Sequence, residues 1–176
     1  MQRAKFFAPL IILGLILFAG SPAMAEHKAK AERLAMDNGF VATAAQGGMA
    51  EVELGKLAQS KATDPAVKQL ADTIVADHTQ ANEELKQIMA KMNMAWPPEM
   101  SSKVQAEKEK LEKLSGAEFD KECVKMMIRD HKHDIRLFER EAKHAENPDV
   151  KNFASQALPK LRNHLQLAEN AWSQLK

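Results

Sequence analysis

The sequence contains one cysteine, Cys123, among 176 residues. A single cysteine excludes an internal disulfide and any metal cluster held by several thiolates. Glycine and proline are also scarce, with 7 of each, and no stretch has the composition of a strand-rich or disordered segment. We therefore expect one all-α domain. Cys123 itself is either a small buried side chain or a thiol that oxidises or pairs with another chain.

The sequence also lacks an excess of charge of either sign. Lysine and arginine number 25, against 24 aspartate and glutamate residues. Proteins that bind nucleic acids usually carry a clear basic surplus, because they neutralise phosphates. The balance therefore argues against a nucleic-acid partner.

Residues 1–25 have the pattern of a signal peptide. Arg3 and Lys5 give the basic start, an apolar run follows from Phe6 to Ala19, and small residues lead to a cleavage site after Ala25. The run is shorter than the roughly 20 apolar residues of a spanning helix. An uncleaved anchor is the alternative interpretation.

Cleavage would leave a mature chain that begins at Glu26 and has no membrane span. Loss of the two basic residues leaves 23 basic against 24 acidic residues. We expect this chain in the bacterial periplasm, with association with the outer membrane as an alternative. Its first residues, 26–36, are polar and are expected to form a frayed lead-in to a domain over 37–176.

Apolar residues recur at steps of three and four in four long stretches, as in amphipathic helices. Two of these stretches begin with a capping residue followed by proline, at Asp64-Pro65 and Asn147-Pro148. Ser115 begins a third with a capping-box pattern. The expected long helices cover residues 38–60, 65–93, 116–146 and 148–175, and a short charged helix covers 101–114.

The four long helices form two hairpins, which predicts an all-α four-helix bundle. A weak repeat supports the pairing, since DPAVKQLA at 64–71 resembles NPDVKNFA at 147–154. The segment 94–115 is long enough to cross back along the bundle, as in ferritin-like topologies. A simple up-down-up-down path is also possible.

One polar residue interrupts the apolar stripe of each long helix: Glu51, His78, His131 and His164. Glu51 lies 13 residues before Asp64 and His78 lies 14 after it; His131 lies 16 before Asn147 and His164 lies 17 after it. At ~1.5 Å per residue, all four fall near the middle of the bundle, whichever ends carry the turns. The alternative for Glu51 is an edge position that reaches solvent.

Three histidines and one carboxylate could hold a single transition-metal ion, with Zn, Cu and Fe all compatible with imidazole. The competing interpretation is a metal-free cluster of hydrogen-bonded histidines and glutamate that fixes the helix register. The di-iron chemistry of ferritins is not expected, because it needs Glu-x-x-His pairs. Here Val75 and Leu161 occupy the positions three before His78 and His164.

Several motifs, taken together, resemble a family of secreted bacterial domains of unknown function, often labelled outer membrane proteins and grouped with ferritin-like bundles. The resemblance covers about residues 36–173. It is carried by FVATAAQGGMAEVELGKLA, VKQLADTIVADHTQANEEL, LSGAEFDKECVKMMIRDH and LPKLRNHL. It implies a ferritin-like fold and brings no established activity. The family's motif histidines match His78, His131 and His164, its first-helix acids match Glu51 and Glu53, and Cys123 replaces its usual tyrosine.

Two hypotheses for the function follow. The first is a periplasmic bundle that binds a transition metal or protects against stress. The second is a non-catalytic envelope protein in which the bundle surface, or a groove opened at Pro159, binds a protein partner, a second copy of the chain or an apolar ligand. No nucleophile motif or phosphate-binding loop is recognisable, so whether the chain is an enzyme is left open.

Overall fold

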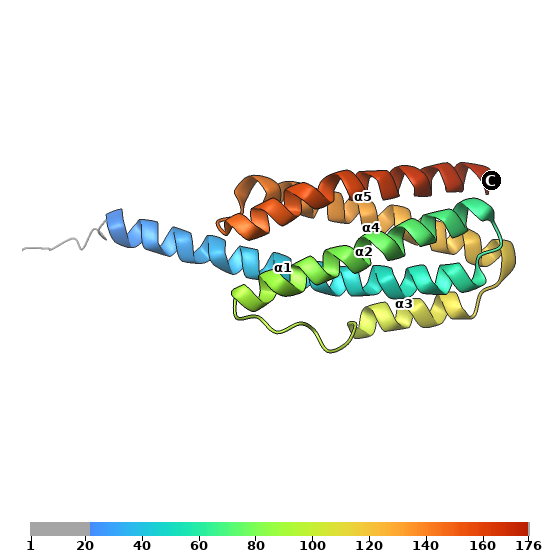
Figure 1. The fold of residues 1–176 in the computed structure, drawn as a ribbon, viewed down its shortest axis with the longest axis horizontal. Helices are drawn as coiled ribbons and strands as arrows, with labels where there is room; N and C mark the ends of the chain where they lie inside the picture. The colour runs from blue at the N-terminus through green and yellow to red at the C-terminus, as the bar shows by residue number, and fades with distance from the viewer. Residues whose placement is uncertain (1–21, 176) are drawn as a thin grey trace, which may run out of the picture.

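The computed structural model describes residues 22–175, and these residues form an all-α bundle, as predicted. Four long helices run along one axis, and a short fifth helix lies against the outside (Figure 1). The helices are α1 (Pro22–Lys61), α2 (Pro65–Lys91), α3 (Ser102–Glu112), α4 (Gly116–His144) and α5 (Pro148–Gln174).

The bundle consists of two antiparallel hairpins, α1 with α2 and α4 with α5, which have the most extensive contacts. The two hairpins contact each other through α2 with α5 and α1 with α4. Helix α3 carries the chain back along the bundle, so that α4 starts beside the α1–α2 turn (Figure 1). The connectivity is therefore the crossed one, and the two hairpin turns lie at opposite ends.

Helix starts follow the capping residues predicted from the sequence. Asp64 accepts a hydrogen bond from the backbone N–H of Ala66, and Asn147 accepts from those of Asp149 and Val150. Ser115 is the residue before α4, but its side chain makes no capping hydrogen bond. The capping box predicted there is wrong. The next residue, Gly116, has φ +57, a left-handed conformation that favours glycine.

Two buried aspartates hold the hairpin turns from the neighbouring hairpin. Asp120 of α4 accepts hydrogen bonds from the backbone N–H groups of Thr63 and Asp64 at 2.9–3.2 Å. Asp37 of α1 accepts from the N–H of Asn147 at 2.7 Å and from that of residue 146 at 3.3 Å. Each carboxylate is only 1% exposed. The two hairpins are therefore joined by polar contacts at both ends of the core.

The core has two apolar clusters, one toward each end. The predicted polar residues lie between them. Along α2, His78 separates Ile74 of one cluster from Leu85 of the other, and along α5, His164 separates Ala168 from Leu161. A polar layer in mid-bundle thus divides the hydrophobic core.

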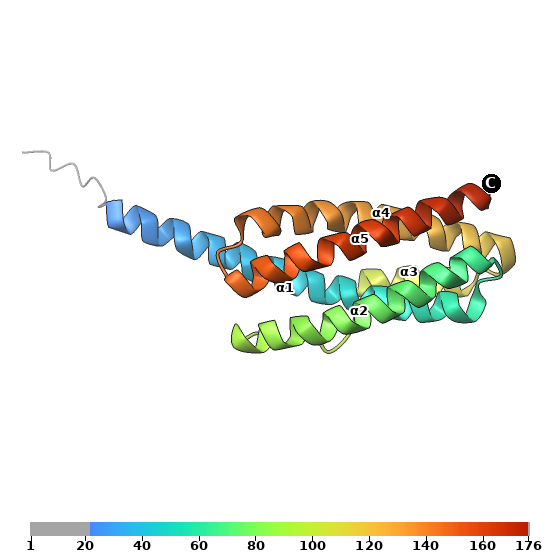
Figure 2. The same ribbon diagram turned by 45° about the horizontal axis from the view of Figure 1, so that its top comes forward.

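The N-terminal part of α1 differs from the prediction. Residues 26–36, expected as a frayed lead-in, continue the helix and extend beyond the other helices as an exposed arm (Figures 1 and 2). This stretch is rich in alanine, lysine and glutamate, all strong helix formers, and has no glycine or proline. Residues 1–21 of the predicted signal peptide lie outside the described residues. Within 22–175, every helix is too short or too polar to span a bilayer.

Candidate metal centre

Three histidines from three helices meet in the middle of the bundle. His78 comes from α2, His131 from α4 and His164 from α5, and one ring nitrogen of each lies within 4.8 Å of the others. His131 and His164 are almost completely buried, at 0% and 1% exposure. His78 is partly exposed as a residue, but its Nε2 is buried and has no hydrogen-bond partner among residues 22–175.

Two of the histidines belong to a continuous chain of hydrogen bonds. His131 Nδ1 lies 2.9 Å from the Met127 carbonyl oxygen, and His131 Nε2 lies 3.2 Å from His164 Nδ1. At the far end, His164 Nε2 lies 2.9 Å from Asp77 Oδ2. A carbonyl and a carboxylate only accept hydrogen bonds, so both outer nitrogens carry a hydrogen.

This chain needs one proton more than two neutral imidazoles supply. The hydrogen bonds to Met127 and Asp77 use the one N–H hydrogen of each neutral ring. A hydrogen bond between His131 and His164 therefore requires a third hydrogen. Complete bonding therefore needs an imidazolium beside the Asp77 carboxylate. With both rings neutral, two lone pairs face each other across 3.2 Å.

Burial opposes that extra proton. It lowers the pKa of His131 to about 4, with a further contribution from His164. It also lowers the pKa of His164, although the hydrogen bond to Asp77 opposes the change. The pKa of His78 falls to about 3 through burial and the nearby His131 and His164. Near neutral pH the three rings are therefore uncharged and present free lone pairs to one another.

Asp77 and Lys160 are parts of the centre that the sequence analysis missed. Burial favours a higher pKa for Asp77, but hydrogen bonds from His164 and Lys160 outweigh it, so the pKa is lowered. Lys160 Nζ lies 3.0 Å from Asp77 Oδ1. A signal existed in the sequence, since an aspartate precedes the histidine in both Asp77-His78 and Asp130-His131. The second aspartate has a different role, because it pairs with Arg129.

Glu51 is buried, as the predicted position in the middle layer requires, and does not lie at an edge that reaches solvent. It lies outside the group of three histidines. In the described part of the chain, its Oε2 has no hydrogen-bond partner. Burial, together with Asp134 and Asp130, raises the pKa of Glu51 well above its usual value. Burial therefore favours the protonated form of Glu51, which stands apart from the three histidines.

Cys123 is also buried, at 2% exposure. Burial, then Glu51 and Asp120, raise the pKa of its thiol to about 12. A thiol with this pKa is protonated and unreactive at neutral pH. The structure therefore agrees with the small buried side chain and gives no support to a reactive thiol.

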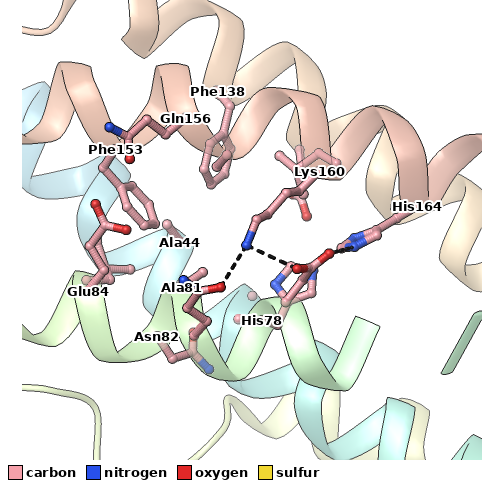
Figure 3. Close-up of a pocket in the computed structure, with 18 of the residues that line it drawn as sticks. Ala44, His78, Ala81, Asn82, Glu84, Phe138, Phe153, Gln156, Lys160 and His164 are labelled. Carbon is pink, nitrogen blue, oxygen red and sulfur yellow. Dashed lines mark hydrogen bonds and ion pairs between the residues drawn. The ribbon is translucent and has the colours of Figure 1, made fainter. Parts of the chain in front are cut away.

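A cavity of about 210 Å³ leads from the surface to the histidines. All four long helices contribute to it. Figure 3 shows the rings of Phe138 and Phe153 toward one end and those of His78 and His164 toward the other, with the Lys160 side chain between them. The centre is thus accessible from an apolar pocket.

The described chain is thus an all-α bundle of two crossed hairpins with a three-histidine layer at mid-height. Comparison with protein families identifies the family. Residues 21–171 match the family described as "Domain of unknown function (DUF4142)", and the chain belongs to it. No match was found among curated proteins.

Solved structures with the same fold include proteins from three bacteria. A DUF305 fragment from Deinococcus radiodurans superposes with a TM-score of 0.70 at 16% identity, over 79% of this chain and 96% of that one. A "putative secreted protein DUF305" from Streptomyces coelicolor gives 0.68 at 14%, over 80% and 93%. A conserved hypothetical protein from Mycobacterium tuberculosis gives 0.60 at 15%, also over 80% and 93%. At these identities the likeness concerns the fold alone.

Proposed function

We propose that this bundle binds one transition-metal ion through His78, His131 and His164. The observation that carries the proposal is the convergence of three buried ring nitrogens that lack enough hydrogens to satisfy one another. A cation would take the place of the missing proton and accept the free lone pairs. Imidazole ligands suit Zn, Cu and Fe.

The surroundings of the rings support this assignment. A metal-bound histidine usually donates its other N–H to a carbonyl or carboxylate, which fixes the tautomer and orients the ring. Here His131 donates to the Met127 carbonyl and His164 donates to Asp77. Nitrogens around a tetrahedral zinc ion lie about 3.3 Å apart, as follows from Zn–N bonds of roughly 2.05 Å. The 3.2 Å between His131 Nε2 and His164 Nδ1 agrees with that spacing.

The cavity reaches two of the three residues that would hold the metal, His78 and His164. Three protein ligands and one open position are typical of zinc sites that bind a further molecule, whereas structural sites use four protein ligands. Glu51 lies outside the histidine group and so is not needed as the fourth ligand. We therefore propose a site that stores, delivers or uses a metal, in keeping with a role in metal handling or stress protection.

Titration of chelator-treated protein with Zn, Cu and Fe tests the proposal. We expect one saturable site for at least one metal, with affinity that falls only as the pH approaches about 4, because imidazole must be neutral to ligate and burial lowers the pKa of His131 to about 4. Metal at 100 times its Kd should stabilise the fold by about 2.7 kcal/mol. His78→Ala should abolish binding, whereas His144→Ala, at an exposed position of α4, should not. No saturable site for any of the three metals would refute the proposal.

A second candidate is a metal-free polar cluster in a non-catalytic envelope protein. The hydrogen bond from His164 to Asp77 favours it, because this bond ties α5 to α2 without an ion. On this alternative, His78→Ala lowers stability equally with and without metal. The same titration therefore distinguishes the two functions.

We also propose that the crossed connectivity of the bundle reflects a ferritin-like architecture. A separate proposal concerns location: the protein works outside the cytoplasm, as a mature periplasmic chain that begins at Glu26. The basic and apolar start of the sequence supports this location. The intact mass of the chain from a periplasmic extract tests it. A mass that retains residues 1–25, found in the membrane fraction, would contradict it.

A further inference from the structure

The cavity beside the histidines has two unlike ends, and its apolar end belongs to no function proposed so far. The rings of Phe138 and Phe153 form this end, with centroids 5.9 Å apart. Small residues from α1 and α2, including Ala44, Gly47 and Ala81, leave the space open. An apolar cavity of about 150 Å³ is enough to bind benzene. At about 210 Å³, this one has room for a substituted ring.

The charges around the cavity favour a cation as its occupant. The basic residue of the lining, Lys160, is already neutralised by Asp77 at 3.0 Å. Two further carboxylates line the cavity, Glu84 and Asp134. Within residues 22–175, neither forms an ion pair or a hydrogen bond with a basic side chain. An anion would instead have to break the pair of Lys160 with Asp77.

Asp134 is the better placed of the two carboxylates. It lies four residues before Phe138 on α4, so the carboxylate and the ring occupy one face of the helix, one turn apart. Burial raises the pKa of Asp134 to about 6, and Asp130 contributes, although His133 opposes the change. Asp134 is therefore mostly ionised at pH 7.5, in a partly buried place where a cation would stabilise it.

We propose that the cavity binds a small organic amine, with its ammonium group against Asp134 and its apolar or aromatic body against the rings of Phe138 and Phe153. An ammonium close to aromatic rings gains a further electrostatic attraction from their faces. The inference goes beyond the proposed metal function and does not need a metal, although both sites share His78 and His164.

Benzylamine is a suitable probe, because it joins an ammonium to a ring of the right size. Binding is measured by NMR titration of the chelator-treated protein at pH 7.5, with benzyl alcohol and benzoate as neutral and anionic probes of similar shape. We expect saturable binding of benzylamine, at least tenfold tighter than that of either other probe, as for a hydrogen bond to a charged group. Equal binding of the three probes, or no saturable binding of benzylamine, would overturn the proposal.

Two variants locate the site. Asp134→Asn should remove the preference for benzylamine over benzyl alcohol and leave the ring's contacts intact. Gly47→Leu should block all three probes, because a Cβ there meets nothing within 4 Å and the longer side chain would enter the cavity. Gly39→Leu is the matched control, since Gly39 lies on the same helix, exposed and equally unobstructed. Binding that survives Gly47→Leu would refute the assigned location.

Failure of this proposal can be told apart from failure of the metal site. Asp134→Asn should bind metal as the unmodified protein does, because Asp134 is not among the three ligands. Conversely, His78→Ala should no longer bind metal. Removal of the His78 ring leaves the Asp134 carboxylate and the two phenylalanine rings in place. Loss of benzylamine selectivity in His78→Ala, with the fold intact, would contradict an ammonium site at Asp134.

Discussion

Lowering the pH should destabilise the metal-free protein through its buried histidines, and His131 provides the clearest test. Its pKa is about 4 in the folded protein, against 6.5 for the ordinary side chain. One pKa unit corresponds to 1.36 kcal/mol, so His131 alone should account for about 3 kcal/mol. Between pH 6.5 and 4 the unfolded chain binds more protons than the folded one, so the free energy of unfolding falls as the pH falls. Above pH 6.5 this contribution is fully present.

Urea denaturation at several pH values between 7 and 4, in the presence of chelator, measures the effect. His131→Gln removes the titrating ring, so the loss of stability over this window should shrink by about 3 kcal/mol relative to the unmodified protein. The comparison uses the slope with pH, because the substitution also lowers stability at every pH by breaking hydrogen bonds. His144→Gln, at an exposed position, is the control and should keep the original slope. The same loss in His131→Gln and in the unmodified protein would refute the reasoning.

Three further predictions concern stability. Asp134→Asn should stabilise the protein at pH 7 by up to about 3 kcal/mol and have little effect below pH 3.8, because burial raises the pKa of Asp134 from 3.8 to about 6 and so penalises the charged carboxylate. Denaturation at pH 7 and pH 3.5 checks this prediction. A gain in stability of equal size at both pH values would contradict it. Asp120→Ala should lower the free energy of unfolding by about 3 kcal/mol in urea denaturation, since it leaves the N–H groups of Thr63 and Asp64 in the α1–α2 turn without acceptors. A decrease below 1 kcal/mol would show that water replaces the carboxylate. Gly55→Ala should lower the melting temperature, because the new Cβ would lie 2.6 Å from Val75 Cγ2, whereas Gly39→Ala should raise it through helix propensity.

Much of the fold could be predicted from the sequence because its signals are local. Proline after a capping residue marks a helix start whatever the neighbours do, and both α2 and α5 begin where Asp64 and Asn147 indicated. The apolar period of three to four predicted which face of each helix is buried. Polar residues that interrupt this period, such as His78, marked the middle layer.

The exceptions were places where a local pattern was outweighed or overlooked. Ser115 had the sequence of a capping box, yet its side chain makes no such hydrogen bond. The polarity of residues 26–36 indicates exposure to solvent and does not determine backbone conformation. The strong helix formers of this stretch allow α1 to continue outward without support from the core.

The sequence by itself determined the all-α class, the two hairpins and the three histidines of the middle layer, because periodicity and capping act over a few residues. Only the tertiary structure decided that the chain crosses back, that Asp77 supports His164, that Glu51 stands apart from the histidines, and that a cavity reaches them. Each of these depends on how helices distant in sequence are rotated and shifted against one another. A rotation of one helix by a single residue, about 100°, is enough to move a carboxylate into or out of a site.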